Sequence, residues 1–258
     1  MGLINYLIMA IDHTGYRGWI YQAWIVVVYI VVGIFCLFWR KHYGYKWFRS
    51  LLIPLFLLLS LNILILLIGW ALTGFTLFGV KNIVVGFPFV PFLAMGFAKL
   101  MKDDWKRMLD YMSPVFPMTQ VVAKISCCFA GCCFGYPMAH GMWNPIFKQY
   151  LFPVQIVEGV VALIITFIMT HIARRQEYRV TGRMYPIFLI LFGGTRFFLE
   201  FLRLNVKMFW GLSMLSLWAL LGVVIGAVWL ILDNRKQRQL AEAETEAEAD
   251  TEAEETQD

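Results

Sequence analysis

The sequence predicts an all-α, polytopic membrane protein with about seven transmembrane helices, its N-terminus outside and its C-terminus in the cytoplasm. Three observations lead to this fold class. The 258 residues are 60% hydrophobic and only 15% charged, with a mean hydropathy of +0.67, whereas soluble domains are roughly 25% charged. Apolar runs of about 20 residues, enough to cross a bilayer, recur along the chain. Basic residues also gather on one side of these runs.

The apolar runs divide the chain into seven expected spans. The third contains two prolines, and the fourth contains a lysine, a glutamine and four cysteines, so we expect the fourth to be irregular or partly re-entrant. The expected spans cover residues 19–39, 51–72, 83–100, 114–135, 151–171, 184–202 and 212–232.

The orientation follows from the positive-inside rule. With the N-terminus outside, 15 Lys and Arg residues fall on the inner side and five on the outer side. This arrangement gives three expected regions: an extracytoplasmic segment at 1–18, a membrane domain at 19–233 and a cytoplasmic tail at 234–258. No cleavable signal peptide is expected, because the first residues carry no basic region. The location predicted is a bacterial cytoplasmic membrane.

The tail is acidic from residue 242 and holds nine of the 17 acidic residues of the chain. Its repeated Ala and Glu residues offer little apolar surface to bury, and like charges repel one another. We therefore expect it to be disordered.

Ionisable residues within the sixth span share one helical face. In FGGTRFFLEFLR, the side chains of Arg196, Glu200 and Arg203 lie at i, i+4 and i+7. Gly193 lies one turn earlier on that face and Gly194 adjoins it, so another helix or a lipid headgroup could approach closely there.

Two further spans carry buried polar residues that could meet this face. Glu158 and Gln155 lie three residues apart in the fifth span, and Lys124 lies in the fourth. Each charge at a bilayer centre costs about 2.5–3.5 kcal/mol on insertion scales. Helix–helix ion pairs would explain such a set, but a functional cavity explains it better, because arginine suits phosphate and a buried carboxylate can act as or orient a base.

The segment KISCCFAGCCFG, residues 124–135, admits three interpretations. Its cysteines could be small packing residues, which we favour. A thiolate assisted by Lys124 could perform redox or acyl-carrying chemistry. Metal binding ranks last, because adjacent Cys-Cys pairs lack the usual metal-ligand spacing and His140 is the nearest imidazole.

Three motifs together resemble the prolipoprotein diacylglyceryl transferase family. After DYMSP (110–114), the segment 124–135 is similar to that family's signature, which usually begins Arg-Ile-Gly-Asn-Phe. PVQIVE (153–158) resembles a Pro-x-Gln-Leu-Tyr-Glu motif. GGTRFFLEFLR (193–203) resembles Gly-x-x-Arg-Phe-x-x-Glu-x-x-Arg, the most specific of the three.

The resemblance implies a transferase that moves diacylglyceryl from phosphatidylglycerol to the cysteine thiol of a prolipoprotein signal peptide, the lipobox cysteine, within the lipid bilayer. It implies no metal, no cofactor and no nucleic-acid partner. Arg196, Glu200 and Glu158 would be catalytic. The substrate-binding residues implied or expected are Lys124, Gln155, Gly135, Gly193, Gly194 and Arg203.

The sequence departs from the family pattern at several positions. Lys124 replaces the signature arginine, Cys127 stands for Asn, Cys132 for Glu and Val157 for Tyr, and the third span reads VGFPFVPFLAMGF without the family's His-Gly-Gly. Two alternatives to the transferase therefore stay open: a relative that binds lipid or a partner without catalysis, and a membrane thiol or metal protein.

Overall fold

The computed structural model describes residues 16–72, 83–130, 133–144, 147–203, 207–209 and 211–255. The expected segment at 1–18 therefore falls almost wholly outside the described residues. The elements, in chain order, are α2 (Tyr16–Trp39), η2 (Arg40–Tyr43), α3 (Trp47–Leu72), α4 (Ile83–Gly86), η3 (Phe87–Phe89), α5 (Val90–Met101), α6 (Trp105–Met112), α7 (Val115–Ala130), β1 (Pro137–Asn144), β2 (Gln149–Leu151), α8 (Val154–Arg175), α9 (Met184–Glu200), β3 (Lys207–Phe209), β4 (Leu212–Ser213) and α10 (Met214–Glu255).

The predicted fold class is confirmed: the molecule is a helical, polytopic membrane protein. Five apolar stretches in the described part of the chain are long enough to cross a membrane, and they belong to α2, α3, α4–α5, α8 and α10. The helices α7 and α9 are shorter, with 16 and 17 residues. The count of seven spans and the orientation stay predictions.

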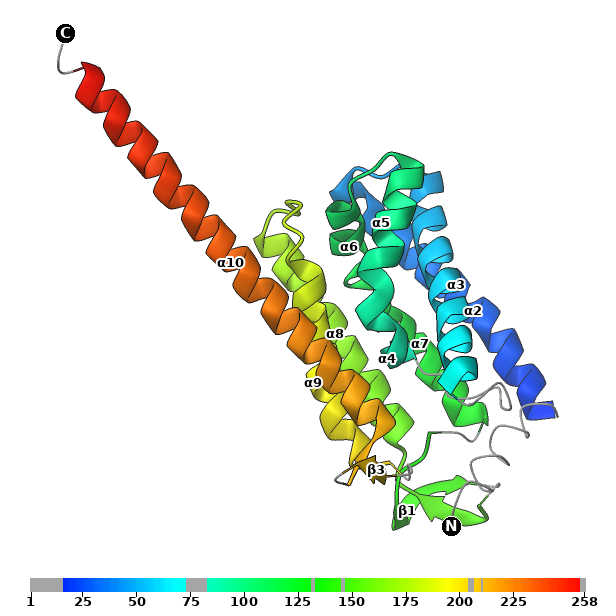
Figure 1. Cartoon of the computed structure of the whole chain (residues 1–258). Helices are drawn as coiled ribbons and strands as arrows, with labels where there is room; N and C mark the ends of the chain where they lie inside the picture. The colour runs from blue at the N-terminus through cyan, green and yellow to red at the C-terminus, as the bar shows by residue number, and fades with distance from the viewer. Residues whose placement is uncertain are drawn as a thin grey trace.

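The helices form a bundle with two short β-hairpins at one end (Figure 1). Neighbours along the second half of the chain pack against one another, α7 on α8, α8 on α9 and α9 on α10, and α7 also packs on α2. The helix α8 therefore has α7 on one side and α9 on the other. Polar residues from these three helices can meet inside the bundle.

The third expected span is broken by its prolines. Proline lacks a backbone N–H and cannot continue the helical hydrogen-bond ladder, and the single turn η3 separates α4 from α5 where Pro88 and Pro91 lie. The carbonyl of Phe87 at this break accepts a hydrogen bond of 2.5 Å from the hydroxyl of Tyr185 in α9. The carbonyl oxygen of Phe87 at the break thus receives its hydrogen bond from within the bundle.

Close packing of α9 on α10 depends on two glycines. A Cβ at Gly193 would lie 2.7 Å from the carbonyl oxygen of Ala219, and one at Gly226 would lie 2.6 Å from that of Pro186. Small residues at such crossings let two helix backbones touch. Of the two partners that the sequence allowed for Gly193, the structure places another helix there, not open space for a headgroup.

The start of α9 is fixed by a carboxylate on α6. The side chain of Asp110 accepts hydrogen bonds from the backbone N–H groups of Thr181, Gly182 and Met184, at 2.8, 2.8 and 3.2 Å. Burial raises the pKa of Asp110 to about 6, although these backbone hydrogen bonds oppose the rise. Asp110 therefore supplies acceptors to unpaired N–H groups at the helix start.

The predicted disorder of the tail is corrected by the structure. The helix α10 continues through residues 234–255 and projects beyond the bundle (Figure 1). Alanine and glutamate are strong helix formers, and the helix is already nucleated by its apolar half, so continuing it avoids the costly first turn. The low apolar content of the tail argues against packing on the bundle, but it does not prevent the tail from being helical.

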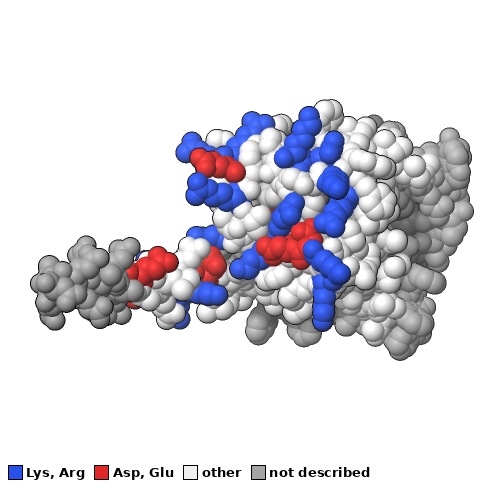
Figure 2. Space-filling view, turned by 90° about the horizontal axis from the view of Figure 1, so that it is seen from above, with Lys and Arg blue, Asp and Glu red and all other residues white. Residues whose placement is uncertain are grey.

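Basic side chains gather at the end of the bundle opposite the hairpins. Figure 2 views this end, where Lys and Arg are prominent on the surface. At this end lie η2 and the connections α5–α6 and α8–α9, whose basic residues the positive-inside count assigns to the inner side. The distribution agrees with the expected orientation.

Replacing Asp110 with alanine tests the contact between α6 and α9. Asp110→Ala leaves three backbone donors without their acceptor, and a buried unpaired donor costs about 1–3 kcal/mol. We expect the free energy of unfolding to fall by roughly 2–4 kcal/mol, measured at pH 7 by thermal or denaturant unfolding in detergent. The matched control is Glu242→Ala, which removes an exposed carboxylate of α10. Equal effects of the two substitutions would contradict this role.

Candidate functional site

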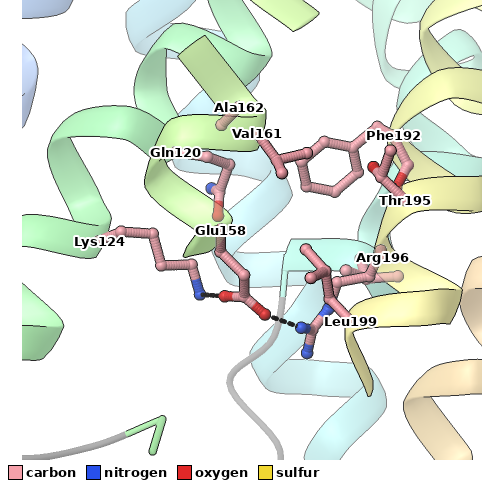
Figure 3. Close-up of a pocket in the computed structure, with 10 residues that line it drawn as sticks. Gln120, Lys124, Glu158, Val161, Ala162, Phe192, Thr195, Arg196 and Leu199 are labelled. Carbon is pink, nitrogen blue, oxygen red and sulfur yellow. Dashed lines mark hydrogen bonds and ion pairs between the residues drawn. The ribbon is translucent and has the colours of Figure 1, made fainter. Parts of the chain in front are cut away.

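The centre of the candidate site is the carboxylate of Glu158 on α8, which is 6% exposed. Three cations converge on it. The ammonium of Lys124, from α7, lies 2.5 Å from Oε2. The guanidinium of Arg203 donates hydrogen bonds to both oxygens of Glu158, with Nε 3.0 Å from Oε1 and Nη2 2.6 Å from Oε2. Arg196, from α9, contacts Oε1 through Nη1, and Figure 3 shows Glu158 between Lys124 and Arg196.

A second carboxylate, Glu200, holds the other side of Arg196. Its Oε2 lies 2.7 Å from Nη2 of Arg196 and 4.0 Å from Nε of Arg203. Its Oε1 accepts a hydrogen bond of 2.8 Å from the hydroxyl of Ser213. Arg196 and Glu200 share one face of α9 as predicted, whereas Arg203 lies beyond the end of that helix and reaches the same cluster from there. Arg196 is fixed between two carboxylates.

Ser213 also caps the following helix. Its Oγ accepts a hydrogen bond of 3.1 Å from the backbone N–H of Ser216, at the third position of α10. Serine is a preferred N-cap residue because its side chain can satisfy such a free N–H group. One hydroxyl therefore links the start of α10 to Glu200. The sequence interpretation missed Ser213, although a serine immediately before a long apolar run is a recognisable cap signal.

Arg203 is placed by a close backbone contact outside α9. It forms an isolated antiparallel bridge with Gly135. A Cβ at Gly135 would lie 2.3 Å from the carbonyl oxygen of Leu202 and 2.7 Å from a methyl group of Val154. Gly135, expected to bind substrate, therefore lies against the chain next to Arg203 and lets that arginine reach Glu158.

The cluster holds one more positive than negative charge. Lys124, Arg196 and Arg203 face two carboxylates, and the side chains of all five are at most 15% exposed. A buried charge without a counter-ion is costly, so an extra cation inside a bundle favours binding of an anion. The arrangement suits a singly charged anionic ligand with oxygen acceptors.

A small pocket adjoins the cluster. Its polar lining comes from Gln120 and Lys124 of α7, Glu158 of α8, and Thr195 and Arg196 of α9. The remaining lining residues are apolar: Val84, Val161, Ala162, Phe192 and Leu199. Gln120 and Thr195 were not predicted, although Gln120 lies one helical turn before Lys124 and could have been found from that spacing. The pocket thus joins charged and apolar walls, as an amphipathic ligand requires.

Two of the residues predicted to bind substrate, Gln155 and Gly194, lie apart from the ion pairs. Gln155 is fully buried on α8, and its Nε2 lies 3.8 Å from the sulfur of Met142 in β1. A Cβ at Gly194 would meet no heavy atom within 4 Å, so open space adjoins that residue.

The described cysteines of the segment 124–135 lie beside the cluster and are not arranged for metal binding. Cys128 donates a hydrogen bond of 3.5 Å to the carbonyl oxygen of Lys124. Cys133 adopts the left-handed backbone conformation, with φ of 63°, and interacts electrostatically with Lys124 and Arg203. Within the described ranges no group of three or more His, Cys, Asp or Glu residues could hold a metal ion. Cys132 lies outside the described residues.

The histidines that the structure describes lie away from the ion pairs. His140 is exposed on β1. His171 accepts a hydrogen bond of 2.9 Å from Arg175 near the last turn of α8. His42 stacks on Tyr178 at the basic end, with ring centroids 4.0 Å apart. The imidazole that the family pattern would place in the third span is absent from the sequence there.

Fold and site together define a polytopic membrane protein with a small pocket beside a buried cationic cluster inside its helical bundle. The family model for prolipoprotein diacylglyceryl transferase matches residues 73–232, more than half of the chain. The chain belongs to the prolipoprotein diacylglyceryl transferase family. It is also 30% identical over 111 residues to a phosphatidylglycerol–prolipoprotein diacylglyceryl transferase of Clostridium tetani, a match that covers 40% of this chain and 44% of the relative. The match thus spans less than half of that relative's length.

Replacing Gly135 tests the close contact that places Arg203. Gly135→Ala puts a methyl group against a backbone carbonyl, so either the bridge opens or the chain shifts. We expect a loss of about 1–3 kcal/mol in the free energy of unfolding, measured in detergent. Gly96→Ala is the matched control, because a Cβ there meets no heavy atom within 4 Å and alanine favours a helix. A Gly135→Ala protein as stable as the control would contradict the contact.

Replacing Ser213 tests the link between the α10 cap and Glu200. Ser213→Ala removes the hydrogen bonds of this hydroxyl to Glu200 and to the backbone and side chain of Ser216. We expect the free energy of unfolding to fall by about 1 kcal/mol, and activity to fall as well, because Glu200 is freed to rotate away from Arg196. Ser213→Thr keeps the hydroxyl and should restore both properties. Ser60→Ala is the control, since that hydroxyl bonds only to carbonyls of its own helix. Full activity of Ser213→Ala would contradict the link.

Proposed function

We propose that this chain is a phospholipid-dependent transferase of a bacterial cytoplasmic membrane. It moves the diacylglyceryl group of phosphatidylglycerol to the thiol of a lipobox cysteine in a prolipoprotein. Family membership supports the class of reaction. The name of the Clostridium tetani relative supports the donor and the acceptor.

The observation that carries the proposal is the excess cation beside the pocket. A phosphodiester has one negative charge, which neutralises the three cations and two carboxylates of the cluster. Arg196 offers a planar donor fork that matches phosphate oxygens, and Lys124 adds a compact charge. The apolar lining from Val161, Phe192 and Leu199 suits the start of the acyl chains.

The proposed transfer requires that the negative charge developing on the leaving phosphate be stabilised. The acceptor sulfur attacks the glyceryl carbon that carries the phosphate ester, an S–C bond forms, and the C–O bond breaks. Glycerol phosphate leaves with a second negative charge, and its oxygens take up the proton that the thiol loses. Fixed cations lower the barrier to such a step, because they need no reorganisation when the charge appears.

In this proposal, Arg196, Lys124 and Arg203 contact the phosphate, and the two carboxylates orient them. Glu158 must then release part of its hold on the cations when the lipid enters. Glu158 and Glu200 are therefore positioning residues whose own contacts change during the cycle. No metal or cofactor is part of the proposed reaction.

A second candidate is a lipid-binding relative without transfer activity. It is favoured by the engagement of both carboxylates in ion pairs and by the distance of the described histidines from the cluster. It predicts that phosphatidylglycerol is retained by the protein but never consumed.

Substitution of Arg196 tests the transferase proposal. We expect Arg196→Ala to lower kcat by a factor of about 10²–10³, the usual effect of losing one donor to a developing oxyanion. Arg196→Lys should keep part of the activity, because the charge remains and the fork is lost. The measurement is the formation of lipidated peptide and free glycerol phosphate from phosphatidylglycerol and a lipobox peptide.

The control is Arg179→Ala, which removes an exposed arginine paired only with Glu177. An Arg196→Ala protein as active as this control would refute the assigned role. Retained lipid without either product in the wild type would favour the second candidate.

A further inference from the structure

The hairpin β1–β2 has an irregular register that leaves part of it unpaired. Pro137 and Met142 both stand opposite Leu151, so the four residues between them bulge out of the ladder. Met138 is 46% exposed, and His140 is exposed beside it. Residues 138–141 therefore have no partner in the register of β1 and β2, and their exposed side chains are open to contact by another chain.

The bulge is held firmly in place. A Cβ at Gly141 would lie 2.4 Å from the carbonyl oxygen of Leu151, so the chain returns to β2 in close contact. At its base, the N–H of Gly135 donates to the carbonyl of Phe152 at 2.8 Å, and Gly135 also bridges Arg203. The hairpin is therefore continuous with the charge cluster.

A buried side chain between the bulge and the cluster, that of Gln155, has one polar atom without a hydrogen bond, although the side chain contacts Met142 and Cys128. The carbonyl oxygen Oε1 of Gln155 has no hydrogen bond in the described structure, although Gln155 is fully buried. Its Nε2 approaches Met142 of β1, so the carboxamide is directed at the hairpin. Buried polar atoms are normally hydrogen-bonded, so this acceptor is available to a donor that a ligand brings.

Gln155 and the pocket lie on opposite sides of Glu158 along α8. The pocket is lined by Val161 and Ala162, about one turn further into the helix. Gln155 lies about one turn in the other direction, toward the hairpin. A donor lipid in the pocket and an acceptor beside Gln155 would therefore approach the cationic cluster from its two ends.

We propose that the bulge Met138–Gly141 and Gln155 form the docking surface for the acceptor, a thiol-bearing apolar peptide in extended conformation. The proposal rests on the proposed function. The peptide adds to the free edge of β1 by backbone hydrogen bonds, as in other strand additions. Its own N–H or S–H group donates to Oε1 of Gln155. The bulge carries no acidic or basic side chain apart from His140, which suits an apolar partner.

Photo-crosslinking tests the surface without requiring catalysis. A benzophenone amino acid is placed at Met138, or as a control at Phe198, which is 71% exposed on α9. The full chain in phosphatidylglycerol nanodiscs is irradiated with a lipobox peptide. Crosslinks from position 138 that exceed those from 198 several-fold support the proposal. Equal yields from both positions, or none from 138, overturn it and indicate that the hairpin contacts only the membrane.

Steady-state kinetics provide a second readout. Gln155→Leu keeps the size of the side chain and removes its amide, so the KM for the peptide should rise about tenfold while the KM for phosphatidylglycerol stays unchanged. A rise confined to the KM for phosphatidylglycerol assigns Gln155 to the donor site and overturns the docking role.

The two proposals fail in different ways. Crosslinking from position 138 without lipidated product refutes the transferase and leaves the docking surface standing. Lipidated product without crosslinking from position 138 refutes the docking surface and leaves the transferase standing.

Discussion

The rest of the site depends on the ionised carboxylate of Glu158, which binds cations from both neighbouring helices. In a membrane interior such a charge is tolerated only when it is paired. Lys124 from α7, Arg196 from α9 and Arg203 beyond α9 all end at its two oxygens. Removing Glu158 would leave three buried cations facing a single carboxylate, and breaking a buried ion pair typically costs 3–5 kcal/mol. The same contacts fix where α7, α8 and α9 meet, so stability and the proposed chemistry rest on one group.

Several neutral contacts keep these cations in place. Gly135 admits the backbone next to Arg203, Gly193 brings α10 against α9, and Ser213 ties the start of α10 to Glu200. Each contact lies beside the charge it positions. These contacts place the cations before any ligand arrives, which favours electrostatic catalysis. In the proposed reaction it is the contacts of the two carboxylates that change when the lipid enters. In the proposed function, the excess positive charge gives the pocket a preference for an anionic lipid.

Much of the charge cluster could be predicted from sequence, because helical spacing alone puts Arg196, Glu200 and Arg203 on one face. The expense of charges in apolar spans likewise singled out Lys124 and Glu158. Spacing could not assign Gly193 to helix packing, since a small residue permits approach by any partner. The hairpin carrying His140 and the bulge was not foreseen, because its pairing depends on tertiary contacts. Disorder was predicted for the tail from its lack of apolar residues, but helix propensity and packing are separate properties. Beyond residue 233, α10 can continue on helix propensity alone.

The central claim is that the cluster carries its extra cation in order to hold a lipid phosphate. Native mass spectrometry can test it by offering the purified protein equal amounts of phosphatidylglycerol and the uncharged diacylglycerol with the same acyl chains. The account predicts that the wild type retains phosphatidylglycerol in clear preference. It also predicts that Lys124→Gln, which removes the excess charge, loses most of that preference. Equal retention of the two lipids by the wild type would contradict the claim.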